Sequence, residues 1–311
     1  QPLTLWECWF YLWVENKSTI TQPGLSDVLI VLTNLKTVGL VDSSRGFWFL
    51  TGRVNLIQQR LQKNRWSIIK RRRAILGASL LAKLPFVRLI ALVNTMSWDG
   101  PQQDSDIDFF IIAKSERLFT VRWLVSLVIH LIGWRRHGYK INNRLCLSFY
   151  VSQAGQNLLP LSYTDDPYLR FWLLAAQPIY DDSNSYLKFI SQNNQLIKDF
   201  PNSQKVLEQL SFSIKPKFEI IKKSGEFLLA GFWGNYMEGW FKRIQIFYMD
   251  KLGRGRFSRR GDGSTAVVVS DVVLKFHESD SRLYLSKLFR QRLAELLSHV
   301  IVSEAKSGTR S

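Results

Sequence analysis

Cysteine is scarce in this chain of 311 residues, which contains only Cys8 and Cys146. Two cysteines exclude a disulfide-rich scaffold. Both lie in apolar surroundings, in the stretches WECWF and RLCLSF. We therefore expect two buried thiols in a reducing compartment, and we predict a cytoplasmic protein.

Long apolar runs are also missing. The longest candidate, residues 118–134, contains Arg122 and His130 and is followed by the sequence RRH. These charges argue against a clean membrane span. We predict a buried helix here and no stable membrane insertion, with membrane association through this helix as the alternative.

Acidic residues are few relative to basic ones, with 25 Asp and Glu against 42 Lys and Arg and a net charge of +17. The electrostatic field of such a positive net charge attracts polyanions, so nucleotides and nucleic acids are expected partners. Alternatively, the excess charge only keeps the surface solvated. The hydrophobic fraction of 46% is typical of a folded globular protein and excludes wholesale disorder.

The pattern predicts an α+β protein with four parts. Residues 1–53 carry helical periodicity at 3–15 and 25–41, with Ser26 as an N-cap, and then a strand-like run at 45–53. This order is typical of a winged-helix-like domain, although any small helical subdomain also fits. Residues 54–84 predict a pair of basic connecting helices, whose KRRR run at 70–73 either contacts phosphates or forms a solvated face.

The third part, residues 85–152, is the predicted core. Apolar runs at 86–93, 107–113 and 144–152 predict strands, and Ser115 is expected to cap a helix over 116–134. The fourth part, residues 153–311, is predicted to be mostly helical. Its expected elements are helices at 166–180, 185–200 and 225–252, a basic loop at 253–264, and a strand and an amphipathic helix within 266–297.

Asp106 and Asp108 stand at the start of the second predicted strand, in the sequence DSDIDFFIIA. Residues two apart on a strand project from one face, so the two carboxylates would lie side by side. Because like charges at that distance repel, a cation between them is expected, and Mg²⁺ prefers carboxylate and phosphate oxygens. An Asp-x-Asp pair alone is also common in turns.

The stretch LVNTMSWDGPQQDSDIDFFII resembles the signature of the DNA polymerase β-like nucleotidyltransferase superfamily. That signature is a strand, a Gly-Ser pair opening a short helix, a spacer of about ten residues, and Asp-x-Asp on the next strand. The segments KLPFVRLIALV, RLFTVRWLVSLVIHLIGWRR, YKINNRLCLSFYVS and VVLKFHESDSR extend the likeness to an uncharacterised bacterial and archaeal branch with a winged-helix-like N-terminus.

The resemblance implies a polymerase β-like core that transfers a nucleoside monophosphate from an NTP to a hydroxyl acceptor. Asp106 and Asp108 would be the catalytic Mg²⁺ ligands, and Asn94 and Thr95 would line the phosphate turn. Apart from the resemblance, Lys140 in the sequence GYKINN is a candidate to neutralise the triphosphate, with an ordinary surface lysine as the alternative. The alternative is a catalytically degenerate protein of the same fold that binds nucleic acid through its winged-helix-like part and the basic helix 54–73.

The chain departs from the family pattern at two places. Asn94-Thr95 replaces Gly-Ser, which puts a side chain where the backbone normally approaches a phosphate. The third acidic residue of active members has no clear counterpart near Ser148. His277 is a further residue of interest, and four acids are candidates to replace the missing one: Asp99, Asp104, Asp165 and Asp166.

Overall fold

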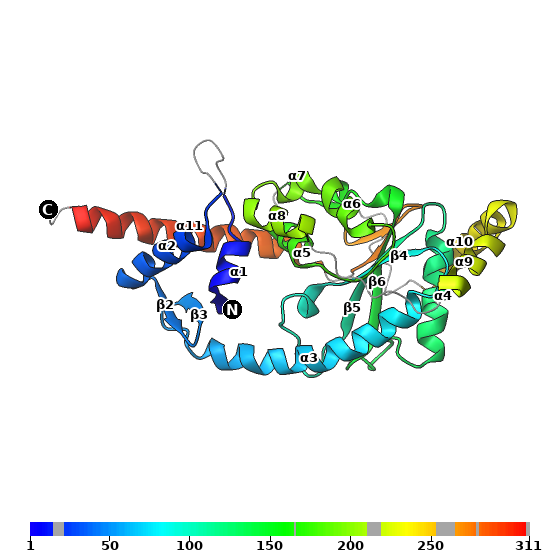
Figure 1. Ribbon diagram of the computed structural model, residues 1–311, viewed down its shortest axis with the longest axis horizontal. Coiled ribbons are helices and arrows are strands. Elements are labelled where there is room, and N and C mark those ends of the chain that lie inside the picture. Colours follow the sequence, from blue (N-terminus) through cyan, green and yellow to red (C-terminus); the bar gives the residue numbers. More distant parts are fainter. Residues whose placement is uncertain (15–21, 165, 210–218, 253–264, 278–279, 309–311) are drawn as a thin grey trace.

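The computed structural model describes residues 1–14, 22–164, 166–209, 219–252, 265–277 and 280–308. It is a mixed α+β structure, as the sequence predicted, and it contains a three-stranded and a six-stranded sheet (Figure 1). The smaller sheet lies near the N-terminus, and the larger sheet lies at the other end of a long helix. The predicted basic loop at 253–264 lies outside the described residues.

The N-terminal part consists of short elements around the small sheet. They are β1 (Leu3–Thr4), α1 (Leu5–Phe10), α2 (Leu25–Thr37), β2 (Val41–Ser44) and β3 (Phe47–Leu50), with strand order β1-β3-β2. The expected order of helix, helix and hairpin is observed. The predicted cap Ser26 is wrong, because α2 begins after Gly24, whose N–H donates to the Asp27 carboxylate at 2.7 Å.

Helix α3 (Leu56–Leu81) is a single helix of 26 residues, so the predicted pair of connecting helices is wrong. No proline interrupts the segment, and its one glycine, Gly77, faces the sheet: a Cβ there would lie 2.8 Å from a Leu145 methyl group. The glycine therefore allows α3 to pass close to the start of a strand rather than ending the helix. Figure 1 shows α3 running from the small sheet to the large one.

The large sheet has the strand order β7-β4-β5-β6-β9-β8. Its strands are β4 (Val87–Leu92), β5 (Ile107–Ala113), β6 (Leu145–Ser152), β7 (Gln177–Asp181), β8 (Val267–Val269) and β9 (Val273–Phe276). Strands β5 and β6 are parallel and the other neighbours are antiparallel. The three predicted core strands are thus confirmed, and both β4 and β5 are buried along their whole length.

Strand β7 corrects the prediction of one helix over 166–180. Helix α5 (Pro167–Ala175) ends before Gln177, and Pro178 follows within β7. Proline lacks an N–H group and is tolerated only on a sheet edge. In agreement with that rule, β7 is an edge strand that pairs only with β4.

Helices cover both faces of the large sheet. One face packs against α5 and against α6 (Ser185–Gln192), α7 (Asn194–Ile197) and α8 (Pro201–Gln209). The other packs against α3, α4 (Leu118–Leu131) and α10 (Gly231–Leu252), which is preceded by α9 (Glu219–Leu228). The last element of the described residues is α11 (Arg282–Gly308). Short 3₁₀ helices are η1 (Asn94–Met96), η2 (Gln153–Gly155) and η3 (Leu159–Leu161).

Helix α4 is capped from a distant part of the chain. The Glu238 carboxylate on α10 accepts the N–H groups of Phe119 and Thr120, each at 2.8 Å. Ser115, the cap expected from the sequence, lies before the N-cap residue Arg117. A carboxylate at a helix N-terminus satisfies unpaired N–H groups and interacts favourably with the helix dipole. None of the helices in the described part of the chain is both long and apolar enough to cross a membrane.

Candidate functional site

The two aspartates predicted as metal ligands lie where β5 begins. Asp106 directly precedes the strand and Asp108 is its second residue, so both project to the same side. In the parallel register with β6, Asp108 lies opposite Cys146. One ligand atom from each of these three residues lies within 4.8 Å of the other two. We call Asp106, Asp108 and Cys146 the ligand cluster.

A local irregularity in β6 shapes this cluster. Asp108 pairs with Cys146, whereas Phe110, two residues later, pairs with Phe149, so β6 has one extra residue between these pairs. Such a bulge re-aims the side chains next to it. Ser148 lies within the bulge, and its Oγ is 3.4 Å from Nε2 of His277.

The electrostatics of the cluster favour an added cation. Burial and the neighbouring Asp106 raise the pKa of Asp108 to about 6, although hydrogen bonds from Asn94 and Cys146 oppose the shift. Burial also raises the pKa of the Cys146 thiol. Nη1 of Arg136 contacts Oδ2 of Asp106 at 2.6 Å and partly balances the paired carboxylates. A divalent ion would balance them more completely.

Helix α3 holds the loop that carries Asp106. Nζ of the buried Lys70 donates to the carbonyl oxygens of Gln103 and Ser105, at 3.0 and 2.7 Å, and to Oδ1 of Asn143 at 2.9 Å. Lys70 therefore ties the loop before β5 to the loop before β6. The KRRR run thus contributes a positioning residue for the cluster, a role that neither sequence interpretation included.

Other basic residues of α3 also contact acidic or aromatic side chains of the protein itself. Arg60 forms an ion pair with Glu7 at 2.6 Å, and Arg71 approaches Asp99 at 3.6 Å. The Arg73 guanidinium lies 4.5 Å from the Trp134 ring centroid. These contacts leave fewer cations on the outer face of α3 than its sequence suggests.

A cavity of about 400 Å³ opens beside the ligand cluster. Strand β9 pairs with β6 only from Phe149 onwards, so the cavity lies next to the part of β6 that β9 does not cover. Its lining includes the cluster together with Asn94, Arg122, Ser126, Arg135, Arg136, Leu145, Leu147, Ser148, Phe276 and His277. Acidic and basic groups therefore line one cavity.

Arg122 and Arg135 contribute positive charge to this cavity. Arg122 donates to Oε1 of Gln245 and lies 4.8 Å from the Phe276 ring centroid, and burial lowers its pKa to about 10. Among the described residues, neither arginine has a carboxylate within ion-pair distance. An incompletely balanced guanidinium beside a cavity favours an anionic ligand.

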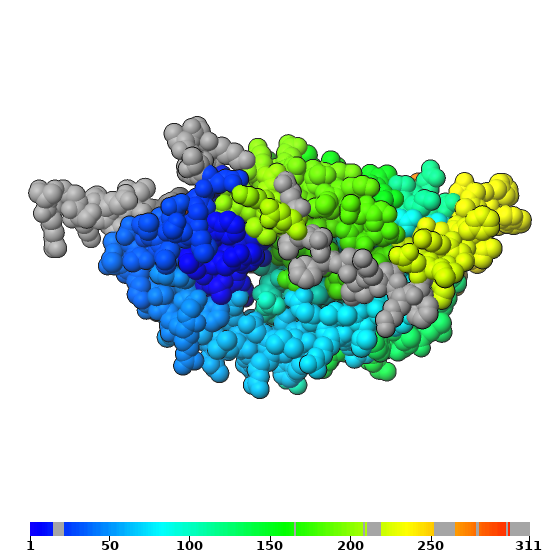
Figure 2. All heavy atoms as spheres, in the orientation of Figure 1, coloured from blue at the N-terminus to red at the C-terminus, as the bar shows by residue number. Residues whose placement is uncertain are grey.

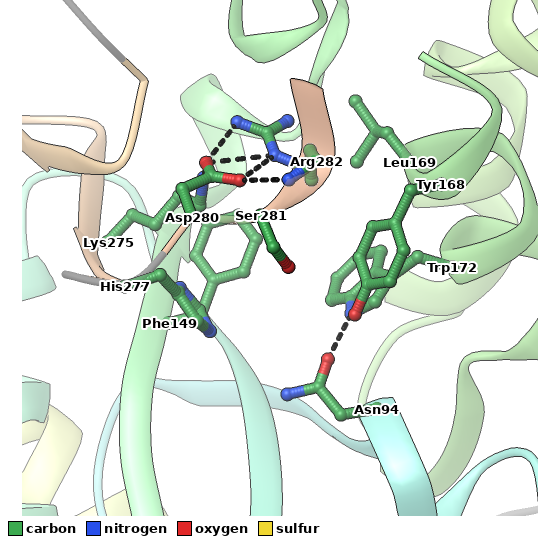
Figure 3. A pocket seen from close by; sticks show the side chains of 10 residues that line it. All are labelled: Asn94, Phe149, Tyr168, Leu169, Trp172, Lys275, His277, Asp280, Ser281 and Arg282. Atoms are coloured by element: carbon green, nitrogen blue, oxygen red, sulfur yellow. Dashed lines mark hydrogen bonds and ion pairs between the residues drawn. The ribbon is translucent and has the colours of Figure 1, made fainter. Parts of the chain in front are cut away.

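A second hollow, of about 100 Å³, shares Asn94 and His277 with the first. Figure 3 shows Tyr168 and Trp172 on one side of it and Lys275, Asp280 and Arg282 on another. Nε1 of Trp172 donates to Oδ1 of Asn94 at 3.0 Å. This bond leaves the amide nitrogen of Asn94 turned toward Asp108, so Asn94 connects the aromatic wall with the ligand cluster.

Of the three residues predicted to contact the triphosphate, one lines the cavities and two do not. Asn94 lies in both cavities, and its φ of 55° is in the left-handed region, where Gly is favoured and Asn is best tolerated among other residues. Thr95 is exposed and lies on η1, outside the lining of either cavity. Lys140 is also exposed, in the turn after α4, and lines neither cavity.

None of the three described candidates for the third acid joins the cluster. Asp99 bonds to Ser67 and Arg71, and Asp104 is exposed on the loop. Asp166 is buried, caps α5 and pairs with Arg282 at 2.9 Å. Asp165 lies outside the described residues. The position beside Asp108 is taken by Cys146, not by Ser148 or a carboxylate.

Sequence reasoning missed Cys146, Arg122 and Arg135 as site residues. The apolar neighbours of Cys146 suggested an ordinary core thiol, since the strand register that places it beside Asp108 cannot be obtained from one sequence. Arg122 was used only as evidence against a membrane span. Its position in an apolar helix was nevertheless the available signal, because a buried charge requires a partner.

No protein-family model, curated protein or solved structure matches the chain. A functional assignment therefore depends on the geometry described above.

Proposed function

We propose that this chain is a Mg²⁺-dependent nucleotidyltransferase with a polymerase β-like core, acting on an NTP and a hydroxyl-bearing acceptor. The observation that carries the proposal is the single cavity in which two adjacent carboxylates face incompletely balanced arginines. Metal-bound triphosphates need both kinds of group: carboxylates for the metal and cations for phosphate oxygens. The resemblance of residues 91–113 to the superfamily signature supports the same assignment.

The donor set fits Mg²⁺ in part. Mg²⁺ is commonly held by one or two carboxylates together with water and substrate phosphates, and Asp106 and Asp108 supply such a pair. The Cys146 thiol is a soft ligand whose raised pKa keeps it protonated, so it does not suit Mg²⁺. When bound, the ion would neutralise phosphate charge and orient the α-phosphate for in-line attack.

The chain's own residues have distinct tasks in this proposal. Asp106 and Asp108 would hold the metal, and Arg122 and Arg135, which line the same cavity, would attract phosphate oxygens. Asn94 favours the ionised form of Asp108, because its amide group lowers the pKa of that carboxyl. In the reaction, the acceptor hydroxyl loses its proton to solvent, its oxygen forms a bond to the α-phosphorus, the bond from that phosphorus to the bridging oxygen breaks, and pyrophosphate leaves.

A labelling experiment tests this function. Each NTP, labelled at the α-phosphate, is incubated with the protein, Mg²⁺ and a mixed extract of RNA and small molecules. We expect a labelled product and released pyrophosphate, and we expect both to fall at least about a hundredfold in Asp108→Asn. Asp104→Asn, an exposed loop carboxylate, is the matched control. Equal transfer by Asp108→Asn and the parent would refute the assignment.

A further inference from the structure

Helix α10 exposes an aromatic stripe far from the ligand cluster in sequence. Phe232, Trp233, Tyr236, Trp240 and Phe247 are 45–78% exposed. At 100° per residue these five positions fall within one sector of the helix, about 100° wide. We call these five residues the aromatic stripe.

The opposite side of α10 packs against the rest of the protein. Phe241 and Met249 are buried, Gln245 donates to the Phe119 carbonyl oxygen at 2.8 Å, and Glu238 caps α4. Helix α10 therefore has its packing face against α4, and the aromatic stripe is an additional apolar face. Scattered apolar residues on a surface need no explanation, but a continuous patch of large aromatics marks an interaction site.

The end of α9 enlarges this surface. Phe227 and Leu228 are 83% and 73% exposed, and the chain turns at Gly231, whose φ of 65° breaks the helical path. The turn brings the end of α9 and the start of α10 together at one tip. Figure 2 shows α9 and α10 as a convex projection at one end of the molecule. A convex apolar tip suits insertion into a soft surface better than it suits capture of a ligand.

The charged residues beside the aromatic stripe indicate which kind of partner surface the stripe binds. Arg243 and Lys251 lie in the same sector of α10 as the stripe and both are exposed, while Asp250 is the one carboxylate that α10 places in that sector, so the sector keeps an excess of positive charge. Tryptophan and tyrosine mixed with Arg and Lys are typical of interfacial helices on anionic bilayers. A second copy would bring like charges together, on chains that each carry +17.

We propose that the aromatic stripe and the α9–α10 tip dock this protein on an anionic lipid surface. The aromatic rings enter the interfacial layer, while Arg243 and Lys251 contact lipid phosphates. The helix lies along the membrane surface and does not span it. This docking surface is independent of the nucleotidyltransferase proposal, since it shares no residue with the cavity.

Vesicle sedimentation of the full chain tests the docking surface. We expect binding to phosphatidylcholine vesicles that contain phosphatidylglycerol and much weaker binding to pure phosphatidylcholine vesicles. Phe232→Ser/Trp233→Ser should reduce the affinity for the anionic vesicles by about tenfold or more. Because both side chains are exposed, the double variant should keep the melting temperature of the parent. Tyr139→Ser, which removes an exposed aromatic ring outside the stripe, should bind like the parent.

Three results would overturn the proposal. One is the absence of binding to anionic vesicles. Another is equal binding by the parent and the double variant, which would mean that net charge alone attracts the protein to lipid. The third is a dimer of the parent in light scattering that becomes a monomer in the double variant, because the stripe would then be covered by a second copy.

Discussion

At the scale of single residues, Cys146 is the feature that most distinguishes the ligand cluster. It lies beside Asp108 on the parallel neighbour strand, where a carboxylate would complete a three-acid metal site. A protonated thiol binds Mg²⁺ poorly, so in the proposed function the ion would be held by the two carboxylates alone. The protein should therefore respond to a change of charge at position 146.

We predict that Cys146→Asp lowers the Mg²⁺ concentration needed for half-maximal NTP binding, on the order of tenfold, because a third carboxylate adds a metal ligand. Without metal, the same variant should melt at a lower temperature than the parent, since three carboxylates repel one another. Cys146→Ser, which adds no charge, is the control. Unchanged metal dependence in a folded Cys146→Asp protein would exclude position 146 from the metal site.

His277 provides a prediction for pH dependence. Burial, followed by the charge of Lys275, lowers the pKa of His277 to about 4 from its ordinary value of 6.5. Between these values the unfolded chain binds the proton more readily than the folded chain. The contribution of His277 is therefore fully present above pH 6.5 and declines as the pH falls toward 4.

Urea unfolding of the parent and His277→Gln between pH 7 and pH 5 measures this contribution. The free energy of unfolding of the parent should fall more steeply on acidification than that of the variant. Parallel pH profiles for the two proteins would show that His277 titrates equally in the folded and unfolded states.

At the scale of elements, α3 and the two loops it contacts explain how the cluster is positioned. Lys70 supplies three hydrogen bonds to segments that are more than thirty residues away in sequence, and none of these partners lies on a strand. Loss of the ammonium group would leave two carbonyl oxygens and one amide oxygen without this donor.

We predict that Lys70→Met lowers the free energy of unfolding by about 2–4 kcal/mol and also weakens metal binding, because the loop before Asp106 loses its anchor. Denaturant unfolding and metal titration provide the two readouts. Arg72→Met, two positions further along the same helix and exposed, should leave both unchanged. Similar losses in the two variants would mean that helix charge, and not the anchor, is responsible.

The elements also show which parts of the structure can be predicted from the sequence. Apolar runs bounded by turns correctly predicted β4, β5, β6 and the helix after β5, since burial and periodicity are local signals. Strand β7 was missed because QPIY follows a helical pattern and contains a proline. The cap on α4 was missed because Glu238 is more than a hundred residues away.

Local sequence signals also predicted one part of the candidate site and missed the rest. Asp106 and Asp108 come from one strand, so their shared face follows from local geometry. Cys146, Arg122 and Arg135 join them only through strand pairing and helix packing, which depend on the whole fold. Thr95 was assigned from the resemblance and Lys140 from its charge, and both side chains are exposed outside the cavities.

At the scale of the whole molecule, the net charge of +17 is the observation behind the second hypothesis, a catalytically degenerate protein that binds nucleic acid. The structure leaves Arg65 and Arg72 exposed on α3, whereas Arg60 and Lys70 are buried. A basic α3 surface should give RNA binding that weakens steeply with salt and weakens further in Arg65→Gln/Arg72→Gln. Filter binding at two salt concentrations measures both effects, and salt-independent binding or equal binding by the variant would exclude this surface.

In the proposed function, the cavity beside Asp106 and Asp108 binds a metal–triphosphate. Calorimetric titration of NTPs in the presence of Mg²⁺ tests it most directly, because no acceptor is needed. We predict saturable binding that is lost without Mg²⁺ and lost in Asp106→Asn/Asp108→Asn, with Asp104→Asn like the parent. Absence of binding in the parent, or equal binding in a folded double variant, would rule out a metal–triphosphate site at Asp106 and Asp108.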